Sequence, residues 1–376
     1  MAEADLPEPD RQEGMPHPRE ATRLVGQEAA EAAFLSAFAS GRLHSGWLIT
    51  GPRGVGKATL AYRIAAFLLS QPAPGAEAGL FGAPPPPATL DLPPDDPDLR
   101  LLRAGAHPRL KILRRGTTEK GDRLAQVITA GVVRSLKDFF HMSSADGGRR
   151  VVIVDSADEM NVQAANALLK ELEEPPAGAT LLLISHQPSA LLPTIRSRCR
   201  TLRLAPLPAP ALAEALTGLG VETRAPEALA VLAAGSVGEA ARMHAAGGLD
   251  LYADLVALLD RLPRLDRPAA IRLAESAAGR AGETRLGLLL DLIDVFLSRA
   301  ARAGLAGEPD TQGAPGEARL LARLAPDARA ARDWATLQQG LSARARHARA
   351  VNIDPAALIL DMLFAIEDTA RRTVPA

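Results

Sequence analysis

Residues 51–59 read G-P-R-G-V-G-K-A-T, and they constrain the fold more than any other part of the chain. Two glycines and the lysine match the phosphate-binding loop G-x-x-x-x-G-K-[ST]. That loop needs a strand before it and a helix after it, and the sequence offers an apolar run at 47–50 and a helical apolar pattern at 57–69. The alternative is a glycine-rich turn between a strand and a helix that binds no phosphate.

One position of the loop departs from the pattern. Ala58 stands where a Ser or Thr hydroxyl ligates the Mg²⁺ of a bound nucleotide. Thr59 carries a hydroxyl one residue later, but one helical step turns it about 100° away. The loop is therefore predicted to cradle phosphates and to hold the metal poorly. The candidate nucleotide-binding residues of this segment are Gly51, Gly54, Gly56, Lys57 and Thr59.

A second motif follows about a hundred residues later. Residues 151–155 form an apolar run closed by Asp155, which is typical of a Walker-B strand whose carboxylate holds Mg²⁺. Ser156 stands where many hydrolases place a glutamate that polarises water, and a serine is no base at neutral pH. Asp158 and Glu159 are expected to face solvent. The alternative is a buried strand with a capping aspartate.

Strands alternate with helical patterns over the first 205 residues, which predicts an α/β fold with a doubly wound parallel sheet. After residue 210 the strand signals vanish and amphipathic helices remain. Further strands are expected at 110–113, 180–185 and 201–204, and a helix at 124–142. The predicted domains are a disordered tail at 1–22, a nucleotide-binding-like domain at 23–207 with a Pro-rich loop at 72–98, a small helical unit at 208–248, and a helical domain at 249–376.

Composition narrows the class of protein. A net charge of -1 argues against a protein that coats nucleic acid by bulk electrostatics. No apolar run reaches the roughly 18 residues that a membrane span needs, and the first twenty residues carry no secretory signal, so a cytoplasmic protein is expected. Cys199 is the single cysteine, which excludes an intramolecular disulfide and a multi-cysteine zinc site.

Two arginine-rich stretches have open interpretations. Residues 194–200 read T-I-R-S-R-C-R, and an arginine held in a loop can act as a bidentate phosphate donor. A solvated basic face at the end of a helix fits the spacing equally well. Residues 100–115 hold six basic residues and no acid, which suits either DNA phosphates or a solvated surface.

Four stretches together resemble bacterial clamp-loader subunits of the AAA+ class. They are L-V-G-Q-E at 24–28, the phosphate-binding loop, N-A-L-L-K-E-L-E-E-P-P at 166–176, and S-R-C at 197–199. The resemblance runs over residues 24–205. It implies an AAA+ domain with a P-loop, a small helical lid at 208–248, and an all-helical collar at 249–376 through which the subunits oligomerise.

The resemblance also implies roles for single residues. In the family's motor subunit the S-R-C arginine acts in trans on ATP bound by the neighbouring subunit, and Arg198 matches it. Ser185 corresponds to sensor 1, a polar residue that faces the γ-phosphate. Gly238 stands where the motor lid carries an arginine, and the nearest arginine is Arg242. This combination implies a subunit that supplies an arginine to its neighbour and has little or no ATPase activity of its own.

The implied partners are a motor subunit of the gamma/tau type and a delta-type subunit in a hetero-oligomer. The sliding clamp and primer-template DNA would be reached through that complex, and no membrane partner is expected. The expected cofactor is weakly bound ATP or ADP. Many relatives carry a four-cysteine zinc module near residues 72–97, which this chain cannot form, so no metal is expected. The alternative function is an active AAA+ ATPase, a divergent motor subunit, against which Ala58, Ser156 and Gly238 count.

Overall fold

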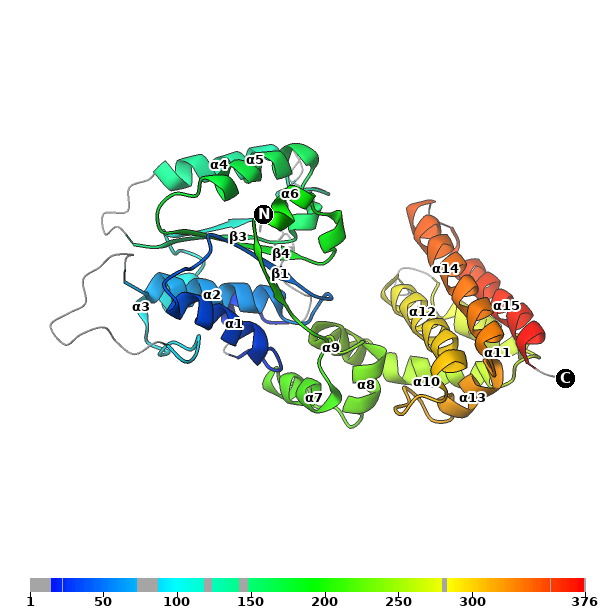
Figure 1. Ribbon diagram of the computed structural model, residues 1–376. Helices are drawn as coiled ribbons and strands as arrows, with labels where there is room; N and C mark the ends of the chain where they lie inside the picture. The colour runs from blue at the N-terminus through cyan, green and yellow to red at the C-terminus, as the bar shows by residue number, and fades with distance from the viewer. Residues whose placement is uncertain are drawn as a thin grey trace, which may run out of the picture. The chain divides into compact units, whose positions relative to one another are not determined.

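The computed structural model describes residues 15–21, 23–72, 87–117, 124–141, 148–278, 283–351 and 353–374. The chain divides into two compact units. The first comprises Met1–Leu207 together with Ser236–Gly238, and the second comprises Pro208–Gly235 together with Glu239–Ala376. Figure 1 labels most of the helices and strands of the two units.

The first unit is built on a five-stranded parallel sheet with the strand order β2-β3-β4-β1-β5. This confirms the predicted α/β fold with a parallel sheet. The strands lie where the apolar runs predicted them. Their bounds are β1 Gly46–Thr50, β2 Leu110–Leu113, β3 Arg150–Val154, β4 Ala179–Ser185 and β5 Arg200–Arg203.

Helices cover both faces of this sheet (Figure 1). Along the central strands, Ile153 and Leu182 belong to the core on the α2 side, while Val152 and Leu183 belong to the core on the α5 side. Burial on both faces explains why these strands read as continuous apolar runs. One face carries α1 Glu28–Ala39, α2 Lys57–Ser70 and α3 Pro97–Arg103; the other carries α4 Ala130–His141, α5 Val162–Glu173 and α6 Pro193–Ser197.

The expected helix at 124–142 is shorter than predicted. It begins at Ala130, because Ile128 is engaged in a parallel bridge with Met160 instead. The Ile128 N–H donates to Glu159 O at 2.9 Å, and Asn161 N donates to Ile128 O at 3.1 Å. A long-range backbone pairing therefore overrides the helical pattern of the first six residues. Residue 142 lies outside the described residues.

The predicted disordered tail at 1–22 is wrong for residues 15–21. They contain a 3-10 turn, Pro18–Glu20, and a His17 side chain that is 1% exposed. His17 packs edge-on against Tyr62, with ring centroids 5.5 Å apart. A polar composition does not reveal one buried histidine that docks on a helix. Residues 1–14 and 22 lie outside the described residues.

The Pro-rich loop predicted at 72–98 ends two residues early. Residues 73–86 lie outside the described residues, and 87–96 contain no helix or strand. α3 begins at Pro97, and Asp96 caps it by accepting a hydrogen bond from Leu99 N at 2.9 Å. A proline suits the first turn of a helix, where its missing N–H leaves no bond unmade.

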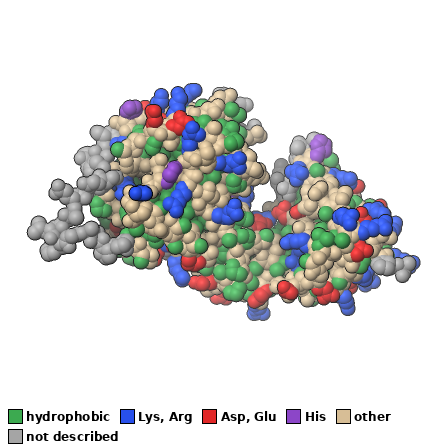
Figure 2. All heavy atoms as spheres, viewed as in Figure 1, with side chains coloured by type: hydrophobic (Ala, Val, Ile, Leu, Met, Phe, Trp, Pro, Cys, Tyr) green, Lys and Arg blue, Asp and Glu red, His purple; other side chains and the backbone are tan. Residues whose placement is uncertain are grey.

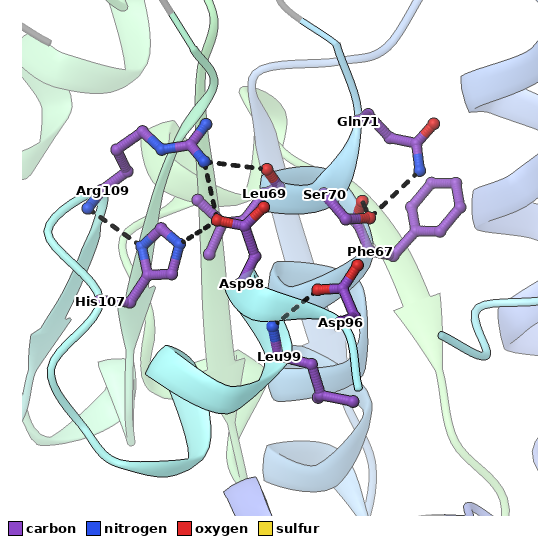
Figure 3. Close-up of polar contacts among 9 residues, drawn as sticks. All are labelled: Phe67, Leu69, Ser70, Gln71, Asp96, Asp98, Leu99, His107 and Arg109. Atoms are coloured by element: carbon purple, nitrogen blue, oxygen red, sulfur yellow. Dashed lines mark hydrogen bonds and ion pairs between the residues drawn. The ribbon is translucent and has the colours of Figure 1, made fainter. Parts of the chain in front are cut away.

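An ion-pair cluster ties the end of this segment to the sheet (Figure 3). Asp98 accepts hydrogen bonds from His107 Nε2 and Arg109 Nη2, both at 2.9 Å. Arg109 Nη2 also donates to Leu69 O at 3.2 Å, near the end of α2. The His107 ring is buried and its Nδ1 accepts from Arg109 N at 3.1 Å. These bonds join α2, α3 and the start of β2.

The second unit is entirely helical among its described residues. Helix α14 packs against both α12 and α15, and α11 packs against α15. The predicted separation of a lid from a collar stays a prediction, since 208–235 and the later helices form one compact unit. The helices are α7 Ala209–Gly218, α8 Pro226–Leu232, α9 Val237–Ala245, α10 Gly248–Leu259, α11 Arg267–Glu275, α12 Glu283–Ala306, α13 Glu317–Leu324, α14 Ala328–Val351 and α15 Pro355–Thr373; the first two residues of α9 belong to the first unit.

A buried carboxylate organises part of this helical unit. Glu317 has no exposed surface, and it accepts hydrogen bonds from Tyr252 Oη at 2.5 Å and from Arg299 Nε at 2.6 Å. Gly313 N donates to its second oxygen at 2.5 Å. A buried charge is tolerated when it is paired and hydrogen-bonded in this way.

None of the helices in the described part of the chain has the length and apolar character of a membrane span.

Candidate functional site

The phosphate-binding loop leaves the carboxyl end of β1 and enters α2 at Lys57. Gly51, Gly54 and Gly56 all have positive φ angles, of 149°, 71° and 99°. A Cβ on Gly51 would lie 2.6 Å from Leu204 O, and one on Gly56 would lie 2.4 Å from Leu24 Cδ1. All three positions favour glycine for backbone conformation, and Gly51 also needs it for space, which is why the motif was readable from sequence.

Lys57 lies folded into its own loop. Its ammonium donates to Gly51 O at 2.6 Å and to Pro52 O at 2.5 Å, and the residue is 3% exposed. The pKa of Lys57 is lowered to about 8, chiefly by burial; Asp158 opposes this shift and Arg53 contributes to it. A bound phosphate would compete with these carbonyls for the ammonium.

The L-V-G-Q-E stretch supports the loop through a residue whose role the sequence did not reveal. The Gln27 side chain donates from Nε2 to Ala205 O at 2.8 Å and accepts at Oε1 from Ala205 N at 3.1 Å. The same amide nitrogen lies 3.5 Å from Val55 O. Gln27 is buried, so its amide links the loop to the segment after β5. Its pairing partners lie too far along the chain for sequence spacing to predict.

Asp155 follows β3, the strand beside β4, and is 7% exposed. Next to it, Ser156 adopts a left-handed conformation with φ 59°, and its Oγ lies 3.2 Å from His186 Nε2. Burial lowers the pKa of His186 to about 4, with Lys57 and Arg53 adding to the shift. The imidazole is therefore neutral at pH 7. Ser156, which stands where many hydrolases have a water-activating carboxylate, therefore offers a hydroxyl hydrogen-bonded to a neutral histidine.

The expectation that Asp158 and Glu159 face solvent is wrong. Asp158 accepts a hydrogen bond from His186 N at 2.9 Å. Glu159 pairs with Arg115 Nε at 2.8 Å and lies 3.6 Å from Arg53 Nη2. Both carboxylates bind side chains or backbone from other segments of the first unit, which their position after a strand did not indicate.

Ser185 ends β4 and is paired in register with Thr50, the residue that precedes the loop. It is fully buried, and among the described residues its Oγ has no hydrogen-bond partner. The structure thus brings Ser185 beside the loop, and its sensor role stays a prediction. Thr59 lies in the first turn of α2, and its role in nucleotide binding also stays a prediction.

Arg198 lies at the other end of the sheet from the loop. It caps α6 just before β5, whose first residue, Arg200, is paired in register with Trp47 at the start of β1. A Cβ on Gly46 would lie 3.1 Å from Arg198 O. The five residues of β1 span roughly 16 Å at about 3.3 Å per residue. Arg198 is therefore remote from the phosphate-binding loop of its own chain.

The Arg198 side chain is 37% exposed and held at two points. Its Nη2 lies 2.7 Å from Glu173 Oε1, and its Nη1 donates to Thr194 O at 3.1 Å. Two of the sequence elements behind the family resemblance, E-E-P-P and S-R-C, thus meet in space. The sequence spacing of these two residues gives no indication that they pair.

Gly238, which stands where the motor lid is expected to carry an arginine, contacts the phosphate-binding loop through its backbone. Gly238 N donates to Gly54 O at 3.1 Å, within the first unit. Arg242 belongs to the second unit, where it is paired with Glu239 and with Asp291, whose Oδ2 lies 2.8 Å from its Nη2.

The basic stretch at 100–115 is not a run of unpaired cations. Arg109 is paired with Asp98 and Arg115 with Glu159, as described above. Figure 2 shows acidic, basic and apolar side chains interspersed on the face in view. Among the described residues, no group of three or more His, Cys, Asp or Glu side chains is arranged to hold a metal ion.

Comparisons with known proteins find similarity to subunits of DNA polymerase III. Residues 26–208 match the family described as DNA polymerase III, delta subunit. The chain is 41% identical to the DNA polymerase III subunit delta′ of Pseudomonas aeruginosa over 236 residues, which cover 61% of this chain and 64% of that one. It is 33% identical to subunit delta′ of Escherichia coli over 174 residues, 46% of each chain.

A more distant relative is the DNA polymerase III subunit tau of Salmonella typhimurium, 28% identical over 71% of this chain and 39% of that protein. The matched part of the chain therefore spans between about half and just under two thirds of the two delta′ relatives.

Proposed function

We propose that this chain acts as a clamp-loader subunit of the delta′ type, because residues 26–208 match the DNA polymerase III delta-subunit family and the chain is similar to subunits named delta′. It supplies Arg198 to the ATP site of an adjacent motor subunit and does not drive hydrolysis itself. The complex then loads a sliding clamp on primed DNA during replication.

One observation carries this proposal. Arg198 lies at the amino end of β1, and the phosphate-binding loop leaves the carboxyl end of the same strand. An arginine in that place serves a nucleotide held by another chain better than one held by its own. Its guanidinium is partly exposed, and a planar, always charged guanidinium suits the developing charge on a transferred phosphoryl group.

The residues of the loop fit a nucleotide's phosphates better than they fit its metal. Three glycines with positive φ, the start of α2 and the Lys57 ammonium are the parts that would hold the phosphates of weakly bound ATP or ADP. Ala58 offers no oxygen to Mg²⁺, and Ser156 offers no base to water. We therefore propose that the loop binds ATP or ADP and that this chain does not hydrolyse the bound ATP.

The proposed partners follow from the relatives. The similarity to subunits named delta′ and tau supports assembly with a gamma/tau-type motor and a delta-type subunit. The sliding clamp and primer-template DNA are reached through the complex.

The test is the ATPase of a complex rebuilt from this chain, a gamma/tau-type motor and a delta-type subunit. Arg198→Ala should lower DNA-stimulated turnover by about 10³-fold or more, as loss of an arginine finger does. Arg196→Ala is the matched control, because Arg196 is exposed on the same short helix, and it should leave turnover unchanged. Size-exclusion chromatography confirms that both variants assemble. Normal turnover with Arg198→Ala overturns the proposal.

A further inference from the structure

We propose that Glu173 is a positioning residue for Arg198, the carboxylate that holds the guanidinium ready for the neighbouring ATP site. The inference rests on the proposed function and adds a second residue to it. It assigns a task to one glutamate of the E-E-P-P stretch.

The first step is the side-chain geometry. Arg198 is tethered by Glu173 Oε1 at 2.7 Å and by Thr194 O at 3.1 Å, two acceptors that come from two different helices, α5 and α6. Two anchors on separate elements bias a long side chain towards one set of rotamers, which lowers the entropy cost when the arginine engages a phosphate. The remaining N–H donors of the guanidinium stay available, since its fork carries more donors than these two bonds use.

The second step is the backbone beneath it. The turn that carries Arg198 packs against the start of β1, where a Cβ on Gly46 would lie 2.9 Å from Leu172 Cδ2 and 3.1 Å from Arg198 O. Leu172 is buried and directly precedes Glu173 in the last turn of α5. The end of α5 thus fixes the backbone of Arg198 through Leu172 and Gly46, and its side chain through Glu173.

The third step is the size of the effect. The side chains of Arg198 and Glu173 are 37% and 48% exposed, so this ion pair is a weak and reversible restraint. Loss of the restraint should lower kcat of the rebuilt complex by roughly 3- to 5-fold, the upper part of the range for an exposed pair. The KM for ATP should not change, because the motor's own loop binds ATP and the arginine acts on the transition state.

The experiment is a double-mutant cycle in the rebuilt complex, with kcat and KM for ATP measured for Glu173→Ala, Arg198→Ala and the double variant. Single-turnover conditions with enzyme in excess make the slow variants measurable. Glu173→Ala should lower kcat in the wild-type background and have no effect in the Arg198→Ala background. Glu173→Gln, which keeps the size of the side chain, should fall between wild type and Glu173→Ala.

The matched control is Glu174→Ala, which removes the exposed neighbouring carboxylate just beyond the end of α5 and should leave kcat unchanged. Glu173 variants that match or exceed wild-type kcat, or that lower kcat equally without Arg198, contradict the positioning role. If Arg198→Ala itself has no effect, the proposed function fails. If Arg198→Ala is impaired while Glu173→Ala is not, the positioning role alone fails.

Discussion

At the scale of single residues, the loop and the strand beside it differ from a hydrolytic P-loop site at two positions. Ala58 lacks the hydroxyl that ligates Mg²⁺, and Ser156 lacks the carboxylate that polarises water. The structure adds what occupies these places. Ser156 Oγ lies beside the neutral His186, and Lys57 binds its own loop carbonyls. The loop has the backbone conformation of a phosphate-binding loop, and these two positions offer neither a metal-ligating hydroxyl nor a carboxylate.

Restoring the missing hydroxyl at position 58 should make ATP binding depend on Mg²⁺. In the wild-type chain, ATP affinity should change by less than about 2-fold when Mg²⁺ is chelated, because no loop hydroxyl ligates the metal. Ala58→Ser should make ATP binding tighter by several fold in the presence of Mg²⁺, without hydrolysis, because Ser156 remains. Isothermal titration calorimetry with and without EDTA measures this. A wild-type affinity that falls tenfold on chelation contradicts the account of the loop.

The pKa of Lys57 predicts a dependence of stability on pH. Folding lowers this pKa from 10.5 to about 8, so between these values the unfolded chain binds more protons than the folded one. The free energy of unfolding contributed by Lys57 should therefore rise from pH 8 towards pH 10. Urea unfolding of wild type and Lys57→Met at pH 7.5, 8.5 and 9.5 isolates the effect. Identical pH slopes in the two proteins would show that the lysine is not desolvated.

At the scale of elements, the sequence predicts whatever depends on local pattern. The strand at 110–113 follows from an apolar run, and it is confirmed. The early residues of the helix expected at 124–142 were predicted wrongly, because a bridge to Met160 replaces helical bonding. Pairing between Glu173 and Arg198 also depends on tertiary structure, and no spacing rule gives it.

Replacing Gly51 tests whether the loop needs a glycine for its backbone conformation and close packing. Gly51→Ala should lower the free energy of unfolding by about 1–3 kcal/mol, because it combines a φ of 149° with a clash against the Leu204 carbonyl. Gly131→Ala in α4 is the control, since a Cβ there meets Thr129 Oγ1 at an ordinary 3.7 Å. It should be neutral or stabilising by up to about 1 kcal/mol. Equal effects of both substitutions, measured by urea unfolding, would contradict the steric argument.

At the scale of the whole molecule, the two units carry separate reporters. The sequence has two tryptophans, Trp47 in the first unit and Trp334 in the second, and both are fully buried. Single-tryptophan variants made by Trp→Phe replacement therefore follow each unit by fluorescence. This allows a substitution to be assigned to one unit without assuming how the units are arranged.

Glu317→Ala should lower the stability of the second unit by about 3–5 kcal/mol, because it leaves the largely buried Arg299 guanidinium and the Tyr252 hydroxyl without the carboxylate that pairs with both. The loss should appear in the Trp334 transition on urea unfolding, with the Trp47 transition unchanged. Glu308→Ala, an exposed carboxylate between α12 and α13, should change stability by less than about 0.5 kcal/mol. A shift of the Trp47 transition alone would contradict this assignment.

The central claim is that this chain keeps a phosphate-binding loop but contributes through an arginine at the other end of the sheet. The direct measurement compares Lys57→Ala and Arg198→Ala in the same rebuilt complex, with DNA-stimulated ATPase as the readout and assembly checked in parallel. The account predicts that Arg198→Ala lowers turnover by about 10³-fold or more while Lys57→Ala leaves it within about 2-fold of wild type. Loss of turnover with Lys57→Ala and normal turnover with Arg198→Ala would contradict it.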